Sequence, residues 1–260
     1  MTAKKTISIS IIGHNEAKNL AGCLASLDWA DEIIFVDCES EDNSLEIARR
    51  FTSKVFSRPN VQNLNINKQF GIDQSTSSWI LYLDPDERIP PETVIWIRET
   101  IQNAGYDAYY FPRKNHMLGR WLRYGGQYPD YQLRLFRKGK AHFPCKHVHE
   151  RLAVTGSTGK SPYELLHHPY PSLEQVIDKF NFYTTFEAIY LAESHPSRLA
   201  GISYLLIKPV SRFFKRYILY GGFIDGYSGF VAAFFDMLNF PVRYLKYIEL
   251  KQKHDSQSID

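Results

Sequence analysis

The chain has 260 residues, 44% of them hydrophobic and 23% charged, and its formal net charge is +3. This composition is typical of a soluble globular protein, and the length suits one large α/β domain or a core domain with an appendage. Such a small net charge gives no support for binding to nucleic acid, so we expect no nucleic-acid partner. Three scattered cysteines and a start without a secretory signal segment predict a cytoplasmic protein.

The first 105 residues alternate between apolar runs and amphipathic stretches. We expect strands at 6–13, 32–37, 55–57 and 79–84, and helices over 20–27, 45–48, 67–74 and 91–102. Asn43 and Glu46 have the spacing of a helix N-cap and its N3 partner. Strands that alternate with helices in this way predict a parallel sheet with helices on both faces.

Acidic residues follow three of the predicted strands. Glu16 comes after the first strand, Asp37 ends the second, and Asp84 and Asp86 follow the fourth. Because the carboxyl ends of parallel strands meet at one edge of a sheet, these carboxylates should converge there. Carboxylates held close together repel one another unless a cation or ligand donors compensate, and paired acids suit Mg²⁺ or Mn²⁺. A solvated turn is the alternative for an isolated Asp-x-Asp pattern.

The sequence after residue 106 predicts two further strands, 108–113 and 130–137. A glycine-flanked loop at 119–126 separates them, and we expect it to be mobile and to lie over the donor. Further on, Cys145, His147 and His149 would share one face of an extended segment. A zinc site therefore remains an alternative interpretation of these three residues, although zinc sites usually need a further ligand that can be clearly identified.

The last 90 residues differ from the rest because aromatic and basic residues are interleaved along predicted helices. A long helix over 173–192 carries an apolar stripe that includes Val176 and Tyr183. Asp225 and Asp236 interrupt the later apolar stretches, so none reaches the roughly 18–20 residues of a membrane-spanning helix. Two interpretations remain open: peripheral binding to an anionic membrane surface, or packing against the catalytic domain or a second copy of the chain.

Several segments resemble a known family. ISIIGHNE, IIFVDCESEDNS and WILYLDPDER resemble the nucleotide-sugar-binding half of the inverting family 2 glycosyltransferases, which have a GT-A fold. YPDYQLRLFRKGKAHF, KHVHERL and FIDGYSG resemble the lipopolysaccharide core glucosyltransferase branch, so the resemblance covers nearly the whole chain. It implies an α/β fold with a mixed, mostly parallel sheet in a catalytic domain at 1–170. Residues 1–105 would bind the nucleotide sugar, 106–170 would form the acceptor side, and 171–260 would be a helical, aromatic-rich extension.

The resemblance also implies roles for individual residues. Those expected to bind the nucleotide sugar are Asn15, Glu16, Asp37, Lys68 and Asp84. Asp86 would bind the metal, and Glu150 would be the general base, with Asp130 as the alternative. The residues assigned to the acceptor are Tyr128, Arg134 and His149; His167 and His168 would contact the acceptor or the diphosphate, or be structural. The chain departs from the family pattern at Cys38, Glu39 and Glu41, and Asn67-Lys68-Gln69 has its two amides exchanged.

The activity that the resemblance implies is metal-dependent, inverting transfer of a hexose to a lipopolysaccharide-core or lipid-linked saccharide, and the expected donor is UDP-glucose. The protein would act as a peripheral protein on the cytoplasmic face of the cell membrane. One alternative is a nucleotidyltransferase, which typically needs a basic glycine-rich loop that residues 11–16 do not supply. The other alternative is a non-catalytic scaffold that binds a sugar nucleotide or a membrane.

Overall fold

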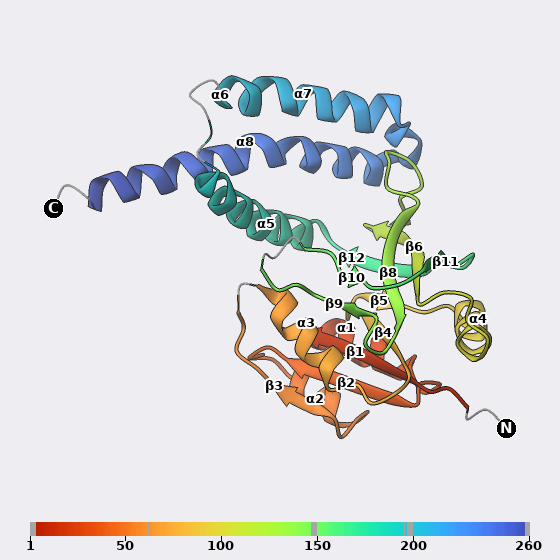
Figure 1. Cartoon of the computed structure of the whole chain (residues 1–260). Helices are drawn as coiled ribbons and strands as arrows, with labels where there is room; N and C mark the ends of the chain where they lie inside the picture. The colour runs from red at the N-terminus through yellow and green to blue at the C-terminus, as the bar shows by residue number, and fades with distance from the viewer. Residues whose placement is uncertain (1–3, 62, 147–149, 195, 197–199, 258–260) are drawn as a thin grey trace. The chain divides into compact units, whose positions relative to one another are not determined.

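A computed structural model describes residues 4–61, 63–146, 150–194, 196 and 200–257 (Figure 1). The chain forms two compact units, of which the first is Met1–Arg113 with Asp130–His167. The second is Lys114–Pro129 with His168–Asp260, so the chain passes between the units three times. The predicted boundary at residue 170 takes no account of Lys114–Pro129, which groups with the C-terminal helices.

The first unit is built on a mixed sheet. The strand order is β3-β2-β1-β4-β8-β6-β12-β5, with β11 and β7 paired to β6. The four strands that begin the path are parallel, whereas β8 is antiparallel to β4 and to β6. The strands of the large sheet are β1 (Ile7–Gly13), β2 (Glu32–Asp37), β3 (Val55–Ser57), β4 (Trp79–Leu83), β5 (Glu87–Arg88), β6 (Ala108–Met117), β7 (Arg120–Trp121), β8 (Asp130–Arg137), β11 (Thr158–Lys160) and β12 (Leu165–Tyr170). Two short strands, β9 (Ala141–His142) and β10 (Ala153–Val154), pair separately.

Helices cover both faces of the parallel strands. On one face, α1 (Ala17–Ala25), α2 (Ser44–Arg49) and α4 (Pro91–Gln102) share a buried apolar cluster with the odd-numbered isoleucines of β1. On the other face, α3 (Leu64–Asp73) packs on β1 and β2. The two faces alternate because successive strand residues point in opposite directions. This confirms the predicted α/β fold class.

Glycine lets α3 lie close to the sheet. A Cβ atom at Gly71 would stand 2.5 Å from the Oγ of Ser10 on β1. The side chain of Asn63 caps α3 by accepting from the N–H of Asn65 at 3.2 Å. The helix therefore begins at Leu64, three residues before the predicted start, and it positions Lys68 over the sheet.

Most predicted elements of the first unit are confirmed, although several of their bounds differ. The strands at 32–37, 55–57 and 130–137 and the helix at 91–102 have the predicted bounds. Asn43 is the N-cap residue of α2, as predicted, but its side chain makes no capping hydrogen bond. Asp42 instead accepts from the N–H of Ser44 at 2.9 Å. The strand predicted at 108–113 continues to Met117.

The second unit is mainly helical. Its long helices are α5 (Leu173–Glu193), which packs against α8 (Gly226–Gln257), and a continuous helix that runs over 200–219. That helix consists of α6 (Ala200–Ile202), the π-helical η1 (Ser203–Ile207), α7 (Lys208–Phe213) and the π-helical η2 (Phe214–Leu219); the 3-10 turn η3 (Gly222–Asp225) joins it to α8. In α5 the predicted apolar stripe is only partly core, because Val176 is buried and Tyr183 is exposed.

Over the described residues, no single helix is long and apolar enough to cross a bilayer. The bent pair Ala200–Leu219 and Gly222–Lys253, whose axes meet at 71°, has sufficient length and apolar character when its two arms are taken together.

The glycine-flanked loop at 119–126 is not the free loop that the sequence predicts. The N–H of Gly125 donates to the carbonyl of Tyr220 at 2.9 Å, and the N–H of Tyr124 donates to Asp225 at 2.8 Å. Arg216 Nη1 donates to the carbonyl of Gly125 at 2.7 Å. These contacts tie the loop to the turn between the C-terminal helices.

Candidate active site

The register of the parallel strands brings three strand ends to one edge of the sheet. Gly13 of β1 pairs with Asp37 of β2, and Ile11 of β1 pairs with Leu83 of β4. Glu16, Asp37 and the segment from Asp84 to Asp86 therefore follow or end neighbouring strands at the same edge. This is the convergence that the sequence predicts.

The turns after β1 and β2 are locked to each other. Asn15 has a left-handed backbone, with φ of 55°, and its Oδ1 accepts from the N–H of Glu41 at 2.8 Å. Asp37 is buried, and its Oδ2 accepts from the N–H of Ser40 at 3.2 Å. Its other oxygen, Oδ1, is buried without a hydrogen-bond partner among the described residues. Because an unsatisfied buried acceptor is costly, this oxygen is suited to accept a hydrogen bond from a ligand.

Two of the departures from the family pattern touch each other. Cys38 is buried, and Asn67 Nδ2 lies 3.3 Å from its sulfur. Burial raises the pKa of the Cys38 thiol, with Asp37 adding to the effect, so the thiol stays protonated. Cys38, which directly follows β2, thus makes a polar contact with α3.

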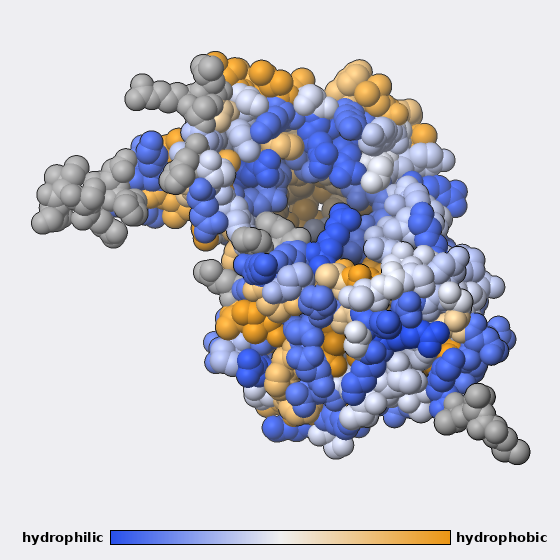
Figure 2. All heavy atoms as spheres, viewed as in Figure 1, coloured by the Kyte–Doolittle hydropathy of each residue, from blue (hydrophilic) through white to orange (hydrophobic). Residues whose placement is uncertain are grey.

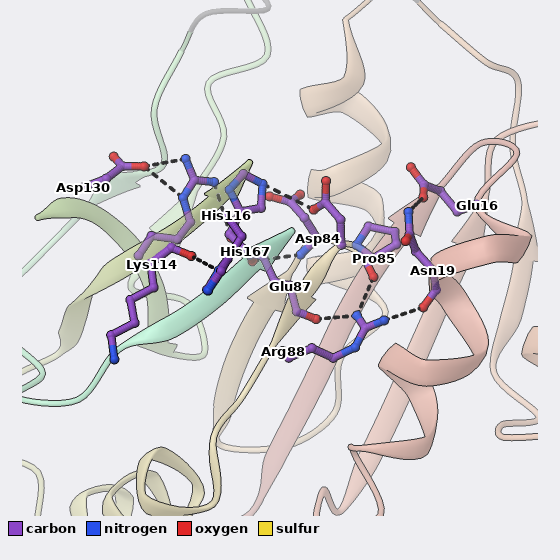
Figure 3. A network of polar contacts seen from close by, with 12 residues as sticks. Glu16, Asn19, Asp84, Pro85, Glu87, Arg88, Lys114, His116, Asp130 and His167 are labelled. Atoms are coloured by element: carbon purple, nitrogen blue, oxygen red, sulfur yellow. Dashed lines mark hydrogen bonds and ion pairs between the residues drawn. The ribbon is translucent and has the colours of Figure 1, made fainter. Parts of the chain in front are cut away.

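Arg88 joins the start of α1 to the turn after β4 (Figure 3). Its guanidinium donates to the carbonyl of Asn19 at 2.8 Å and to the carbonyl of Pro85 at 2.8 Å. Asn19 in turn donates to Glu16 Oε2 at 2.9 Å. Glu16 and the Asp-Pro-Asp turn are thereby held in a fixed relation.

Asp84 is held by hydrogen bonds on both carboxylate oxygens. The Tyr82 hydroxyl donates to Oδ1, and Arg134 Nη2 donates to Oδ2. Fully buried Glu87 accepts from the same Arg134 nitrogen at 2.6 Å and from the N–H of Asp84 at 3.1 Å. Burial by itself would raise the pKa of Asp84, but Arg134 and Lys68 outweigh it and hold this pKa well below the usual range. Asp84 is therefore a fixed anion at every physiological pH.

Asp130, the alternative base, is engaged by cationic and amide donors. Arg113 donates to its Oδ2 through Nε at 2.9 Å and through Nη2 at 2.6 Å (Figure 3). Gln132 donates to Oδ1 at 2.7 Å. Donors of this kind stabilise the charged carboxylate and make it a poorer proton acceptor.

Asp86 is the candidate metal ligand at this edge of the sheet. It is buried, and its Oδ1 lies 3.5 Å from Nε2 of His167, which pairing of β5 with β12 brings alongside. Within the described ranges, no group of three or more His, Cys, Asp or Glu side chains would enclose a metal. Mg²⁺ commonly takes one or two carboxylates and completes its coordination shell with substrate phosphates. Asp86, with His167 beside it, is compatible with such a Mg²⁺ site. The zinc alternative depends on His147 and His149, which lie outside the described residues.

Asp84, the acid that follows β4, and Glu150, the predicted base, line the same cavity of about 280 Å³. Its lining includes Lys68, Tyr82, Asp84, Arg134, Phe143 and Glu150. Glu150 accepts one hydrogen bond from the N–H of Lys146 at 2.8 Å. Lys68 lies over the Tyr82 ring, 4.0 Å from Asp84 Oδ1, so it is a cavity residue rather than a solvated helix lysine. Burial lowers the pKa of Lys68, and Asp84 opposes that shift.

The residues predicted to bind the acceptor have different surroundings. Arg134 lines the cavity while it pairs with Asp84 and Glu87. Tyr128 belongs to the second unit, where its ring packs edge-on against Trp121 at 5.2 Å. His149 lies outside the described residues, and His168 stacks on His116 in the second unit at 4.5 Å.

Sequence reasoning missed three residues that shape this site: Tyr82, Glu87 and Arg113. Tyr82 looked like one member of an apolar strand, yet its hydroxyl binds Asp84. Glu87 was visible as a third acid in the Asp-Pro-Asp-Glu segment. Its burial follows from Arg134, which lies 47 residues further along the chain, so the local sequence carried no signal of it.

The chain is similar to known glycosyltransferases over most of its length. The family model described as Glycosyl transferase family 2 matches residues 8–155. The lipopolysaccharide core biosynthesis glycosyltransferase LpsC of Rhizobium meliloti (strain 1021) is 26% identical over 263 residues, covering 98% of this chain and 95% of LpsC. An uncharacterized glycosyltransferase of Rickettsia felis is 26% identical over 259 residues, covering 95% of this chain and 89% of that protein. The solved structure of S. aureus TarS 1-349 covers 94% of this chain and 91% of its own, with 14% identity and a TM-score of 0.49, too distant a likeness to bear on function.

Proposed function

Since the chain belongs to glycosyl transferase family 2, we propose that it transfers a hexose, with inversion, from a nucleotide sugar to a lipopolysaccharide-core or lipid-linked saccharide. One observation carries the proposal: a single cavity is lined by the fixed anion Asp84 and by the carboxylate of Glu150. The first belongs to the edge where the nucleotide sugar would bind. The second is positioned to act as a base. The proposed donor is UDP-glucose, as the resemblance implies.

In the proposed donor site, the open oxygen of Asp37 accepts a hydrogen bond from the nucleoside, and Glu16 follows the neighbouring strand β1 at the same edge of the sheet. Asp84 faces the ribose, and Lys68 lies close enough to it to face the diphosphate. Asp86, with His167 beside it, would hold a Mg²⁺ or Mn²⁺ ion, which when bound neutralises charge on the leaving diphosphate.

Glu150 is the proposed general base. As the acceptor oxygen attacks the anomeric carbon, its proton passes to the Glu150 carboxylate. The bond from that carbon to the diphosphate breaks, and its electron pair stays on the phosphate oxygen. Attack from the face opposite the leaving group inverts the anomeric centre. Asp130 is less suited to this step because Arg113 and Gln132 already donate to both of its oxygens.

Titration calorimetry with UDP and UDP-glucose tests the donor site. We expect binding that requires Mn²⁺ in the full chain and is lost in Asp86→Asn. Asp28→Asn, at an exposed position outside the site, is the matched control and should bind as the unchanged protein does. If no nucleotide binds under any metal condition, the transferase proposal is wrong and the scaffold becomes the better hypothesis.

We also propose that the protein works on the cytoplasmic face of the cell membrane, as a peripheral protein. A lipid-linked acceptor would be presented there, and the aromatic, basic character of the C-terminal helices supports this place.

A further inference from the structure

We infer that the second unit carries a built membrane-binding surface, made jointly by the C-terminal helices and by the segment Lys114–Pro129, that lies in the interface of an anionic bilayer. The inference deepens the proposed function and rests on it for the nature of the acceptor. The surface itself is argued from exposure, charge and backbone geometry within the second unit.

The helix over 200–219 is amphipathic, but its apolar side faces outward and its polar side packs inward, the reverse of a helix on the surface of a water-soluble protein. Its polar side packs inward, because Arg212 Nε and Arg216 Nε donate to Asp236 Oδ2 of α8 at 2.8 and 2.7 Å. Its outward side carries an exposed apolar strip of Ile202, Leu206, Val210, Phe214 and Ile218. Figure 2 shows apolar side chains along this outer edge of the helix, at the top of the view. Charged groups paired on the inner side with apolar groups exposed on the outer side are unfavourable in water but suit a lipid interface.

The strip runs into a second exposed group, which we call the apolar corner: Leu219, Tyr220, Phe223, Ile224 and Tyr227. Leu219 is 65% exposed, Phe223 52% and Tyr227 64%. In soluble proteins single exposed apolar residues are ordinary, but contiguous patches mark binding sites. Aromatic residues in such a place suit the boundary between headgroups and acyl chains.

The apolar corner has a defined backbone rather than a loose one. A Cβ atom at Gly229 would stand 2.0 Å from the carbonyl oxygen of Gly222, so α8 begins in direct contact with the preceding turn. Gly221 and Gly226 have φ of 68° and 63°, which side chains rarely tolerate. Asp225 is buried and accepts from Tyr124, so this acid does not face solvent. The glycines therefore hold the apolar side chains outward in a fixed arrangement.

Basic residues flank the corner from both segments. Arg120 donates to the carbonyl of Ile224 at 3.2 Å, and the Lys215 ammonium lies 5.4 Å from the Tyr220 ring centre. Exposed Arg123 lies against Trp121 in the loop that is tied to this corner. The stretches 114–129 and 200–236 together contain seven Lys and Arg residues and two acids, Asp225 and Asp236. Asp225 is buried, and Asp236 accepts from Arg212 and Arg216.

This charge pattern selects an anionic lipid surface as the partner. A second copy of the chain would bring the same positive charge against itself, and like charges across an interface are unfavourable. Anionic headgroups would meet Lys215, Arg120 and Arg123 while the apolar corner enters the region beneath them.

Vesicle co-sedimentation of the full chain tests the inference. We expect binding to phosphatidylcholine vesicles that contain phosphatidylglycerol, weak binding to phosphatidylcholine alone, and release at high salt. Arg123→Gln with Lys215→Gln should weaken binding about thirtyfold, the equivalent of about 1 kcal/mol for each charge. Phe223→Ser with Ile224→Ser should weaken it at least about tenfold. The matched controls are Lys138→Gln and Ile95→Ser, which lie at exposed positions of the first unit.

Four outcomes would overturn the inference. The first two are the absence of vesicle binding and equal binding to both lipid compositions. The third is retention of the protein on vesicles after an alkaline carbonate wash, which indicates a membrane-spanning segment. The fourth is a dimer, in place of vesicle binding, that dissociates when Phe223 and Ile224 are changed. Calorimetry of UDP-glucose without vesicles reports on the donor site alone. Failure of the surface is therefore distinguishable from failure of the proposed transferase.

Discussion

At the scale of single residues, the site depends on which carboxylates are already engaged. Asp84 and Asp130 each receive donors on both oxygens, whereas Asp37 keeps one buried oxygen open and Glu150 accepts from Lys146 beside the cavity. Carboxylates that accept hydrogen bonds on both oxygens keep the geometry of the site fixed. Those with fewer partners among the described residues, Asp37 and Glu150, are available to a ligand or a proton. This difference leads us to separate positioning acids from reacting acids.

The choice of base gives the first prediction. Glu150→Gln should lower kcat at least about 10²-fold, because an amide cannot accept the acceptor's proton, and should leave the UDP-glucose affinity unchanged. Asp130→Asn should lower kcat less than about tenfold. The measurements are initial rates of hexose transfer and calorimetry of donor binding. If Asp130→Asn abolishes transfer with donor binding intact while Glu150→Gln does not, the assignment of the base is reversed.

Glu32, a half-buried acid outside the active site, gives a prediction about pH. Burial opposes ionisation of Glu32, yet hydrogen bonds from Lys54, Ser8 and Thr76 lower its pKa from 4.5 to about 2. A lowered folded-state pKa stabilises the protein above the unfolded-state value, and this stability is lost as the pH falls toward 2. The full contribution is about 3 kcal/mol.

Urea unfolding of the unchanged protein and Glu32→Gln tests this prediction. The difference in unfolding free energy between them should fall by more than half from pH 6 to pH 3. Glu99→Gln, at an exposed position on α4, is the control. A difference that is the same at both pH values would contradict the assignment.

At the scale of elements, the predictions held where the signal was local and differed where it was not. β2, β3 and β8 and helix α4 have their predicted bounds because burial leaves an apolar or alternating pattern in a short window. The first turn of α3 was missed because Leu64 and Ile66 are exposed and add no periodicity. The Glu87–Arg134 pair was not predictable, since it needs β8 to return beside β4. Strand-end acids could be named from the sequence, and their partners could not.

The close packing of α3 gives an element-scale prediction. In a helix, Gly→Ala usually stabilises by about 1 kcal/mol, but Gly71→Ala places a Cβ 2.5 Å from Ser10 Oγ. We expect Gly71→Ala to lose about 1–2 kcal/mol of unfolding free energy, the range seen for overpacked sites. Ser10→Ala removes a buried hydroxyl that has no described hydrogen-bond partner, so Ser10→Ala with Gly71→Ala should be more stable than Gly71→Ala alone.

The measurement is denaturant unfolding of the three variants. Gly105→Ala is the control, because its added Cβ meets nothing within 4 Å. Stabilisation by Gly71→Ala alone would show that α3 does not rest on β1 in the way described.

At the scale of the whole molecule, the second unit is not a simple appendage to the catalytic one. Met117 and Leu122, which lie in the first half of the chain, are buried against Val176, Val231 and Ala232. The predicted division at residue 170 separates these partners. The sequence reveals a change of composition near residue 171, but it does not reveal that an earlier segment belongs with the tail.

This arrangement predicts the effect of truncation. A chain that ends at residue 170 leaves Met117 and Leu122 without their apolar partners, so we expect it to be aggregated or to bind the dye ANS strongly. A chain that ends at residue 253 keeps the cluster and should remain monodisperse. Soluble yield and size-exclusion chromatography measure the difference. A monodisperse, cooperatively folded 1–170 fragment would show that the cluster is dispensable.

The three passages of the chain between the units also bear on recombination among related genes. A single crossover near residue 168 would exchange the helices but leave Lys114–Pro129 behind, so the carbonyls that Arg216 binds would come from the other parent. Natural or engineered hybrids therefore need two coordinated exchanges to stay intact. Among relatives, residues 114–129 should change in step with 168–260 more closely than with the catalytic sequence that surrounds them.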